Sequence, residues 1–105
     1  MLLSSCYDKG YITVQNKVHN ATLSHISWAD YSLVSSLSPG EKSLKMTVSE
    51  KKKNFPKSDI IKFYMQRGEN QVYLETKYSF TVDADQHLIV TISDTTSVIN
   101  PLTME

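Results

Sequence analysis

The sequence lacks several features that mark particular classes of protein. It has 105 residues and one cysteine, Cys6, so no disulfide can form within the chain. Glycine and proline occur three times each, which excludes collagen-like and low-complexity chains. No apolar run approaches the roughly 18 residues that a membrane-spanning helix needs. Basic and acidic residues balance at eleven each, so the surface as a whole has no net attraction for nucleic acid.

What the sequence does contain is a two-residue alternation of apolar and polar side chains. The alternation recurs in short runs separated by turn-forming residues, which is typical of half-buried strands. The runs cover residues 11–15, 22–28, 31–37, 44–48, 60–66, 72–82 and 88–92. This pattern predicts an all-β fold, a two-sheet antiparallel β-sandwich of about seven strands, for which an immunoglobulin-like arrangement is one candidate.

Three details refine this prediction. The apolar residues of the second run change face between Leu23 and Ile26, which a β-bulge would reconcile. The run over residues 72–82 is long for one strand, so we expect it to bend near Thr76 and to pass from one sheet to the other. The segment Ser38-Pro39-Gly40-Glu41 predicts a type II turn, because proline suits its second position and glycine its third.

The alternation also predicts which side chains face the core. Eight apolar residues lie on the inward phase of their runs: Leu44, Met46, Val48, Phe63, Leu74, Phe80, Val90 and Ile92. One alternative stays open, a helix over residues 57–66 that Ser58 would cap.

The first residues carry a short motif. Leu3-Ser4-Ser5-Cys6 resembles the bacterial lipobox, in which small residues admit the signal peptidase and the cysteine thiol takes a diacylglyceryl group. Only Met1 and Leu2 precede the box, so a full signal would have to be encoded upstream of Met1. We therefore expect a flexible tail over residues 1–9 with this lipobox-like remnant, lipid attachment at Cys6, and a single β-sandwich domain over residues 10–105. The alternative is a free cysteine in a frayed tail.

A wider resemblance spans most of the chain. It rests on Gly10-x-Ile12-x-Val14-x-Asn16, Ile26-x-Trp28, Leu37-Ser38-Pro39-Gly40-Glu41 and Thr95, which together are similar to small envelope lipoproteins of the Bacteroides type. The resemblance implies a β-sandwich at the bacterial cell envelope, on the outer membrane or the periplasmic face. It implies a non-catalytic accessory or binding module whose partners are the membrane, through the lipid anchor, and an unidentified protein or glycan.

The strongest shift in composition is a basic segment. Residues 42–67 hold eight basic and two acidic residues, whereas residues 68–105 have a net charge of −5. This segment predicts an alternative function, the binding of a polyanion or nucleic acid, with Phe55 stacking on a base. The residues of such an anion-binding patch would be Lys51, Lys52, Lys53 and Lys57. We favour solvated lysines that protect strand edges, so nucleic acid is not the expected partner.

No motif predicts catalysis. The sequence has no Gly-x-Ser-x-Gly elbow and no glycine-rich phosphate loop. Asp83, Asp85 and Asp94 lack the spacing of a calcium-binding loop, and the first two fit a turn better. Trp28 fits a core or rim position better than a ligand platform. The histidines and the cysteine lack the spacing of metal ligands: His19, His25, His87 and Cys6. We therefore expect no catalytic residue, no metal and no cofactor.

Overall fold

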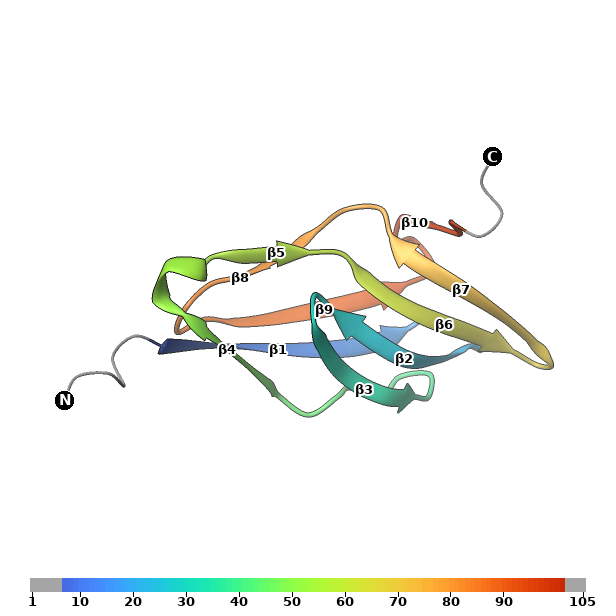
Figure 1. The fold of residues 1–105 in the computed structure, drawn as a ribbon. Helices are drawn as coiled ribbons and strands as arrows, with labels where there is room; N and C mark the ends of the chain where they lie inside the picture. Colours follow the sequence, from blue (N-terminus) through green and yellow to red (C-terminus); the bar gives the residue numbers. More distant parts are fainter. Residues whose placement is uncertain (1–6, 102–105) are drawn as a thin grey trace.

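The computed structural model describes residues 7–101 and is built almost wholly of strands. Ten strands and one short 3-10 turn follow one another along the chain (Figure 1). They are β1 (Tyr7–Lys17), β2 (Thr22–Trp28), β3 (Tyr31–Leu37), β4 (Met46–Lys51), η2 (Lys52–Asn54), β5 (Lys57–Asp59), β6 (Ile61–Arg67), β7 (Asn70–Thr76), β8 (Phe80–Val82), β9 (His87–Ser93) and β10 (Val98–Ile99).

The strands form two main sheets that pack against each other. One sheet has the order β10-β7-β6-β2-β3 and the other β4-β1-β9, while β5 and β8 form a separate pair. The predicted β-sandwich is confirmed. The alternative helix over residues 57–66 is wrong, because β5 and β6 occupy that stretch. In β6 the side chains of Ile61 and Phe63 are buried and Lys62 between them is exposed, which is the period of a strand.

The first strand departs from a purely antiparallel arrangement. β1 pairs antiparallel with β4 but parallel with β9, with Ile12 opposite Leu88. A parallel pair cannot be joined by a hairpin, so most of the chain lies between its two members. The strand count is also higher than about seven, because short strands at residues 57–59 and 98–99 add to the predicted runs and the run over residues 72–82 divides into β7 and β8.

The predicted turns and the bulge are confirmed. The Glu41 amide donates to the Ser38 carbonyl at 3.0 Å, and Gly40 has a φ of +86° in the turn between them. The register between β2 and β6 shifts between Ser24 and Ser27, and His25 takes a φ of +48° within that bulge. The bulge lets Leu23 and Ile26 both reach the core.

The long alternating run breaks near Thr76 as predicted, but its second part joins the separate β5–β8 pair and not the other main sheet. Its first part is β7, which pairs with β6, and its last part is β8, which pairs with β5. The break begins at Thr76, whose hydroxyl accepts from the Ile61 amide at 2.9 Å and donates to the Tyr78 carbonyl at 3.0 Å. These side-chain bonds stand in for ladder bonds at the point where the strand leaves its sheet.

The core lies between the two main sheets. Of the residues predicted to face inward, five are buried: Val48, Phe63, Leu74, Val90 and Ile92. Met46 and Phe80 are partly buried and pack against this core. The prediction for Leu44 is wrong, since 83% of this residue is exposed. It lies ahead of β4, in a segment that Ser43 holds to β1 by accepting a hydrogen bond from the Val14 amide at 2.9 Å.

The folded part begins earlier than the sequence indicated. β1 starts at Tyr7 and pairs with β4 from Tyr7 onward, so residues 7–9 belong to a strand and not to a tail. Gly10 is buried within β1, where an added Cβ would lie 2.6 Å from the Asp83 carbonyl oxygen. Glycine is therefore required for β1 to approach the turn between β8 and β9 so closely. Cys6 and the rest of residues 1–6 lie outside the described residues.

Candidate functional site

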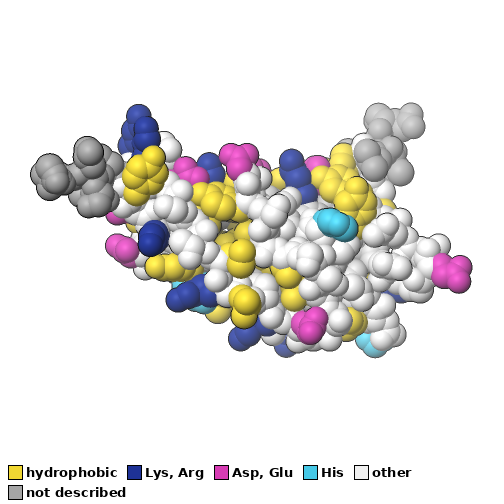
Figure 2. All heavy atoms as spheres, turned by 60° about the horizontal axis from the view of Figure 1, so that its bottom comes forward, with side chains coloured by type: hydrophobic (Ala, Val, Ile, Leu, Met, Phe, Trp, Pro, Cys, Tyr) yellow, Lys and Arg dark blue, Asp and Glu magenta, His cyan; other side chains and the backbone are white. Residues whose placement is uncertain are grey.

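Three consecutive lysines protrude at the end of the sandwich where β1 begins. Lys51 ends β4, and Lys52 and Lys53 open the 3-10 turn that leads to β5. We call Lys51, Lys52 and Lys53 the lysine tip. All three are exposed, and none forms an ion pair within residues 7–101. Figure 2 shows basic side chains at the end that carries the N-terminus, with others spread along the same face.

Lys57, the fourth residue of the predicted patch, interacts with the protein's own side chains. Its ammonium lies 3.9 Å from Glu50 Oε2, the same oxygen that lies 2.5 Å from the Tyr31 hydroxyl. Burial, followed by the hydrogen bond to Glu50, raises the pKa of Tyr31 to about 12. The Tyr31 hydrogen bond is the main reason that the pKa of Glu50 lies below its usual value. The predicted patch is therefore three free lysines and one lysine engaged in a network.

The other basic residues of the segment lie apart from the tip. The Lys45 ammonium lies 4.6 Å from the centre of the Tyr11 ring, and the backbone of Lys42 forms an isolated antiparallel β-bridge with that of Gln15. Lys62 stands opposite Glu75 in the pairing of β6 with β7. The fold thus divides residues 42–67 among several surfaces, and the lysine tip is the part of the segment that stays clustered.

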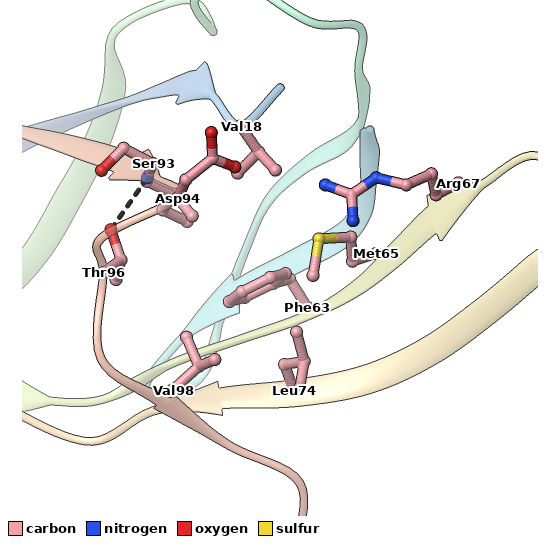
Figure 3. Close-up of a pocket in the computed structure, with 10 residues that line it drawn as sticks. Val18, Phe63, Met65, Arg67, Leu74, Ser93, Asp94, Thr96 and Val98 are labelled. Carbon is pink, nitrogen blue, oxygen red and sulfur yellow. Dashed lines mark hydrogen bonds between the residues drawn. The ribbon is translucent and has the colours of Figure 1, made fainter. Parts of the chain in front are cut away.

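A pocket of about 190 Å³ opens between the two sheets at the other end of the molecule (Figure 3). It lies where β1, β6 and β9 end, at the edge that β10 and the preceding loop cover. Its floor is apolar and consists of Val18, Phe63, Met65, Leu74, Ile92 and Val98. An apolar cavity of roughly 150 Å³ is large enough for a benzene ring, so this pocket fits an apolar group of about that size.

The rim of the pocket is polar. Arg67 and Asp94 both hold the backbone of His19: an Arg67 Nη2 hydrogen is donated to the His19 carbonyl at 2.9 Å, and the His19 amide donates to Asp94 Oδ1 at 3.1 Å. Figure 3 shows the Arg67 guanidinium extending from β6 over Met65 toward the loop that carries Asp94. The Ser93 amide donates to Thr96 Oγ1 at 2.8 Å, which fixes the start of that loop. Guanidinium has five donors, so Arg67 retains hydrogen-bonding capacity at the mouth.

The sequence did not predict this pocket. Its lining comes from four stretches that are distant along the chain, around residues 18, 63–67, 74 and 92–98. The only local signal is Arg67, which directly precedes Gly68 in the sequence. A basic residue at such a position is common on any surface, so it does not by itself indicate a cavity.

The remaining candidates have structural positions. Trp28 is fully buried and its Nε1 donates to the Phe80 carbonyl at 3.0 Å, so the predicted core position is confirmed. Asp83 Oδ1 accepts from the Ala84 amide at 2.7 Å, and Asp85 has a φ of +62°, as the predicted turn requires. His87 Nε2 lies 2.7 Å from Thr13 Oγ1. Within residues 7–101 no three His, Cys, Asp or Glu side chains are grouped in a way that could hold a metal ion.

Comparisons with known proteins add no relative. No protein-family model, no curated protein and no solved structure matches the chain significantly. The described part of the chain, residues 7–101, has no helix long and apolar enough to cross a membrane. The resemblance to envelope lipoproteins therefore remains a prediction from the sequence.

Proposed function

We propose that this chain is a non-catalytic, lipid-anchored domain of the bacterial cell envelope, with a binding role at the end remote from the anchor. One observation carries the proposal: the lipobox-like Leu3-Ser4-Ser5-Cys6 runs directly into Tyr7, the first residue of β1. Consecutive Cα atoms are about 3.8 Å apart, so a lipid on Cys6 would leave almost no linker between bilayer and sandwich.

The arrangement of the two ends supports the same proposal. The strand that follows Cys6 starts at one end of the elongated molecule, whose principal extents are 54 × 32 × 20 Å. The residues that line the pocket lie where β1, β6 and β9 end, and Figure 1 shows that β1 runs from the N-terminal end of the molecule toward the other end. A domain anchored through Cys6 would thus present Arg67 and the pocket away from the membrane. An apolar group of a protein, glycan or small-molecule ligand would fill the floor, with its polar part at the rim.

The test uses the native gene with its upstream sequence. Changing Cys6→Ala should move the protein from the membrane to the soluble fraction, because the thiol that takes the lipid is lost. The control is Ser5→Ala, which keeps a small residue in the box and should leave the protein at the membrane. Intact mass of the membrane-extracted protein should show a diacylglyceryl group on Cys6 as the first residue. An unmodified Cys6 on a chain that still carries its upstream residues would overturn the proposal.

A further inference from the structure

The lysine tip and the proposed anchor lie side by side. In the pairing of β1 with β4, Tyr7 is the direct partner of Lys51. Lys52 and Lys53 follow at once in the 3-10 turn, which has no side-chain cap and no buried residue. A lipid on the residue before Tyr7 would therefore bring these three ammonium groups to the membrane surface.

Within residues 7–101 no acidic side chain forms an ion pair with the tip. Glu50 is engaged with Tyr31 and Lys57. Asp8 pairs with Glu50, which is the position next to the pair formed by Tyr7 and Lys51. Asp83 and Asp85 belong to the β8–β9 turn. The Gln86 amide donates a hydrogen bond to the Asp83 carbonyl, and the Asp85 amide donates one to the Lys9 carbonyl. The lysine tip therefore keeps three unpaired positive charges within residues 7–101, at the surface that the anchor would hold against the bilayer.

The aromatic residues at this end favour a membrane over nucleic acid. Phe55 is half-buried and packs against the core, so it is not a free platform on which a base could stack. Tyr7 is 54% exposed beside the tip, and a tyrosine with an apolar ring and a polar hydroxyl suits the headgroup layer of a bilayer.

We infer that the lysine tip binds the headgroups of anionic phospholipids in the membrane that holds Cys6. The inference rests on the proposed anchoring, whose two acyl chains it supplements. A positive cluster next to the attachment point gives a second, electrostatic contact. Each lysine near an anionic surface raises the membrane partition coefficient about fivefold, so three lysines give on the order of 100-fold. The contact would also fix the rotation of the domain and keep the pocket directed away from the bilayer.

The experiment uses Cys6, the single thiol of the chain, to attach one acyl chain chemically. The purified protein is alkylated with a 14-carbon N-alkyl maleimide, because one such chain binds a bilayer only marginally and leaves the lysine effect measurable. Partition is measured on vesicles of phosphatidylcholine and of phosphatidylcholine with 30% phosphatidylglycerol. We expect the anionic lipid to raise the partition of the unaltered protein about 100-fold, and 0.5 M salt to remove most of that gain.

Matched variants locate the effect. Changing Lys51, Lys52 and Lys53 to Gln should remove nearly all of the gain. The control changes Lys17, Lys42 and Lys77 to Gln, three exposed lysines outside the tip with the same loss of charge, and should keep most of it. Should the triple variant fold poorly, Lys52→Gln and Lys53→Gln alone should each lower the gain about fivefold.

The outcomes separate this inference from the proposed function. Because the acyl chain is attached by chemistry, the partition is measured whether or not the cell lipidates Cys6. Equal partition on neutral and anionic vesicles, or an equal loss in the two triple variants, would overturn the role of the tip while leaving the anchor intact. A tight, salt-resistant complex of the tip with one defined oligonucleotide would also overturn it, in favour of nucleic acid.

Discussion

The two ends of the sandwich are closed in different ways. Where β1 begins, Gly10 lets the strand lie directly against the β8–β9 turn, and the fully buried Trp28 donates its indole hydrogen to the Phe80 carbonyl. Where β1 ends, the two sheets leave a pocket of about 190 Å³ between Val18, Phe63 and Val98. One end is filled by side chains and close backbone contact, and the other keeps an open space.

The difference shows where the fold can tolerate change. Protein interiors pack nearly as densely as crystals, so at the filled end an added atom has no free space to enter. At the open end the lining atoms lack neighbours on one side and forgo dispersion contacts. We therefore expect the end near the proposed anchor to be rigid and intolerant of substitution, and the pocket end to accept changes that reshape its floor.

The largest expected effect comes from removing Trp28. Trp28→Ala should lower the free energy of unfolding by about 3–5 kcal/mol, because it leaves a large cavity and an unpaired Phe80 carbonyl. Leu74→Ala at the pocket floor should cost about 2–5 kcal/mol, in the lower half of that range, since Leu74 already borders open space. Both values can be measured by urea unfolding monitored through the far-ultraviolet circular dichroism of the backbone, a signal that does not depend on Trp28. A larger loss for Leu74→Ala than for Trp28→Ala would contradict the contrast between the ends.

Adding carbon atoms tests the same contrast, because it should lower the stability at the filled end and raise it at the pocket. In Gly10→Ala the new Cβ would lie 2.6 Å from both the Asp83 carbonyl oxygen and Val82 Cγ1, so we expect a loss of about 1–3 kcal/mol. Val98→Leu adds one methylene at the pocket and should stabilise the protein by about 0.5–2 kcal/mol, as cavity-filling changes commonly do. Thermal and urea unfolding of the two variants should shift in opposite directions. Destabilisation by both would mean that the pocket is as tightly packed as the filled end.

The sequence predicted those parts of the fold that local alternation governs. The bulge between Leu23 and Ile26 and the break of the long run at Thr76 both followed from counting positions along one run. Leu44 misled the prediction because the alternation of β4 continues backward through it, whereas the hydrogen bonds of Ser43 to Val14 hold that segment outside the strand. Such a long-range contact leaves no trace in the local pattern.

The start of the fold and the pocket could not be predicted for the same reason. Tyr7 to Gly10 contains two charges and a glycine, which is typical of a turn, and only the pairing with β4 more than 35 residues later makes it a strand. The pocket depends on how far apart two sheets lie where they end. The lysine tip was visible as a charge cluster, but its place beside the N-terminal strand depends on the pairing of Tyr7 with Lys51.

The smallest expected effect concerns pH and the Tyr31–Glu50 pair at the filled end. The pKa of Tyr31 is about 12 in the folded protein and about 10 in an unfolded chain, chiefly because of burial. Below pH 10 both states keep the proton and the stabilisation is complete; as pH rises through 10–12 only the unfolded state loses it, so the free energy of unfolding falls. Tyr73, whose pKa burial also raises to about 12 beside Glu75, adds to the same decline.

Tyr31→Phe should therefore make the decline between pH 10 and 12 shallower, and Tyr73→Phe should do the same independently. On the acid side the pKa of Glu50 is lowered mainly by the Tyr31 hydrogen bond, so that contribution is present at neutral pH and is lost as pH falls through the folded pKa. Tyr31→Phe should flatten this acid limb as well, whereas Tyr73→Phe should not. Tyr78→Phe, at a position 66% exposed, is the control and should follow the unaltered protein at both limits. Urea unfolding at intervals from pH 3 to 12 measures all four proteins, and an acid limb that Tyr31→Phe leaves unchanged would mean that the Tyr31–Glu50 hydrogen bond does not stabilise the filled end.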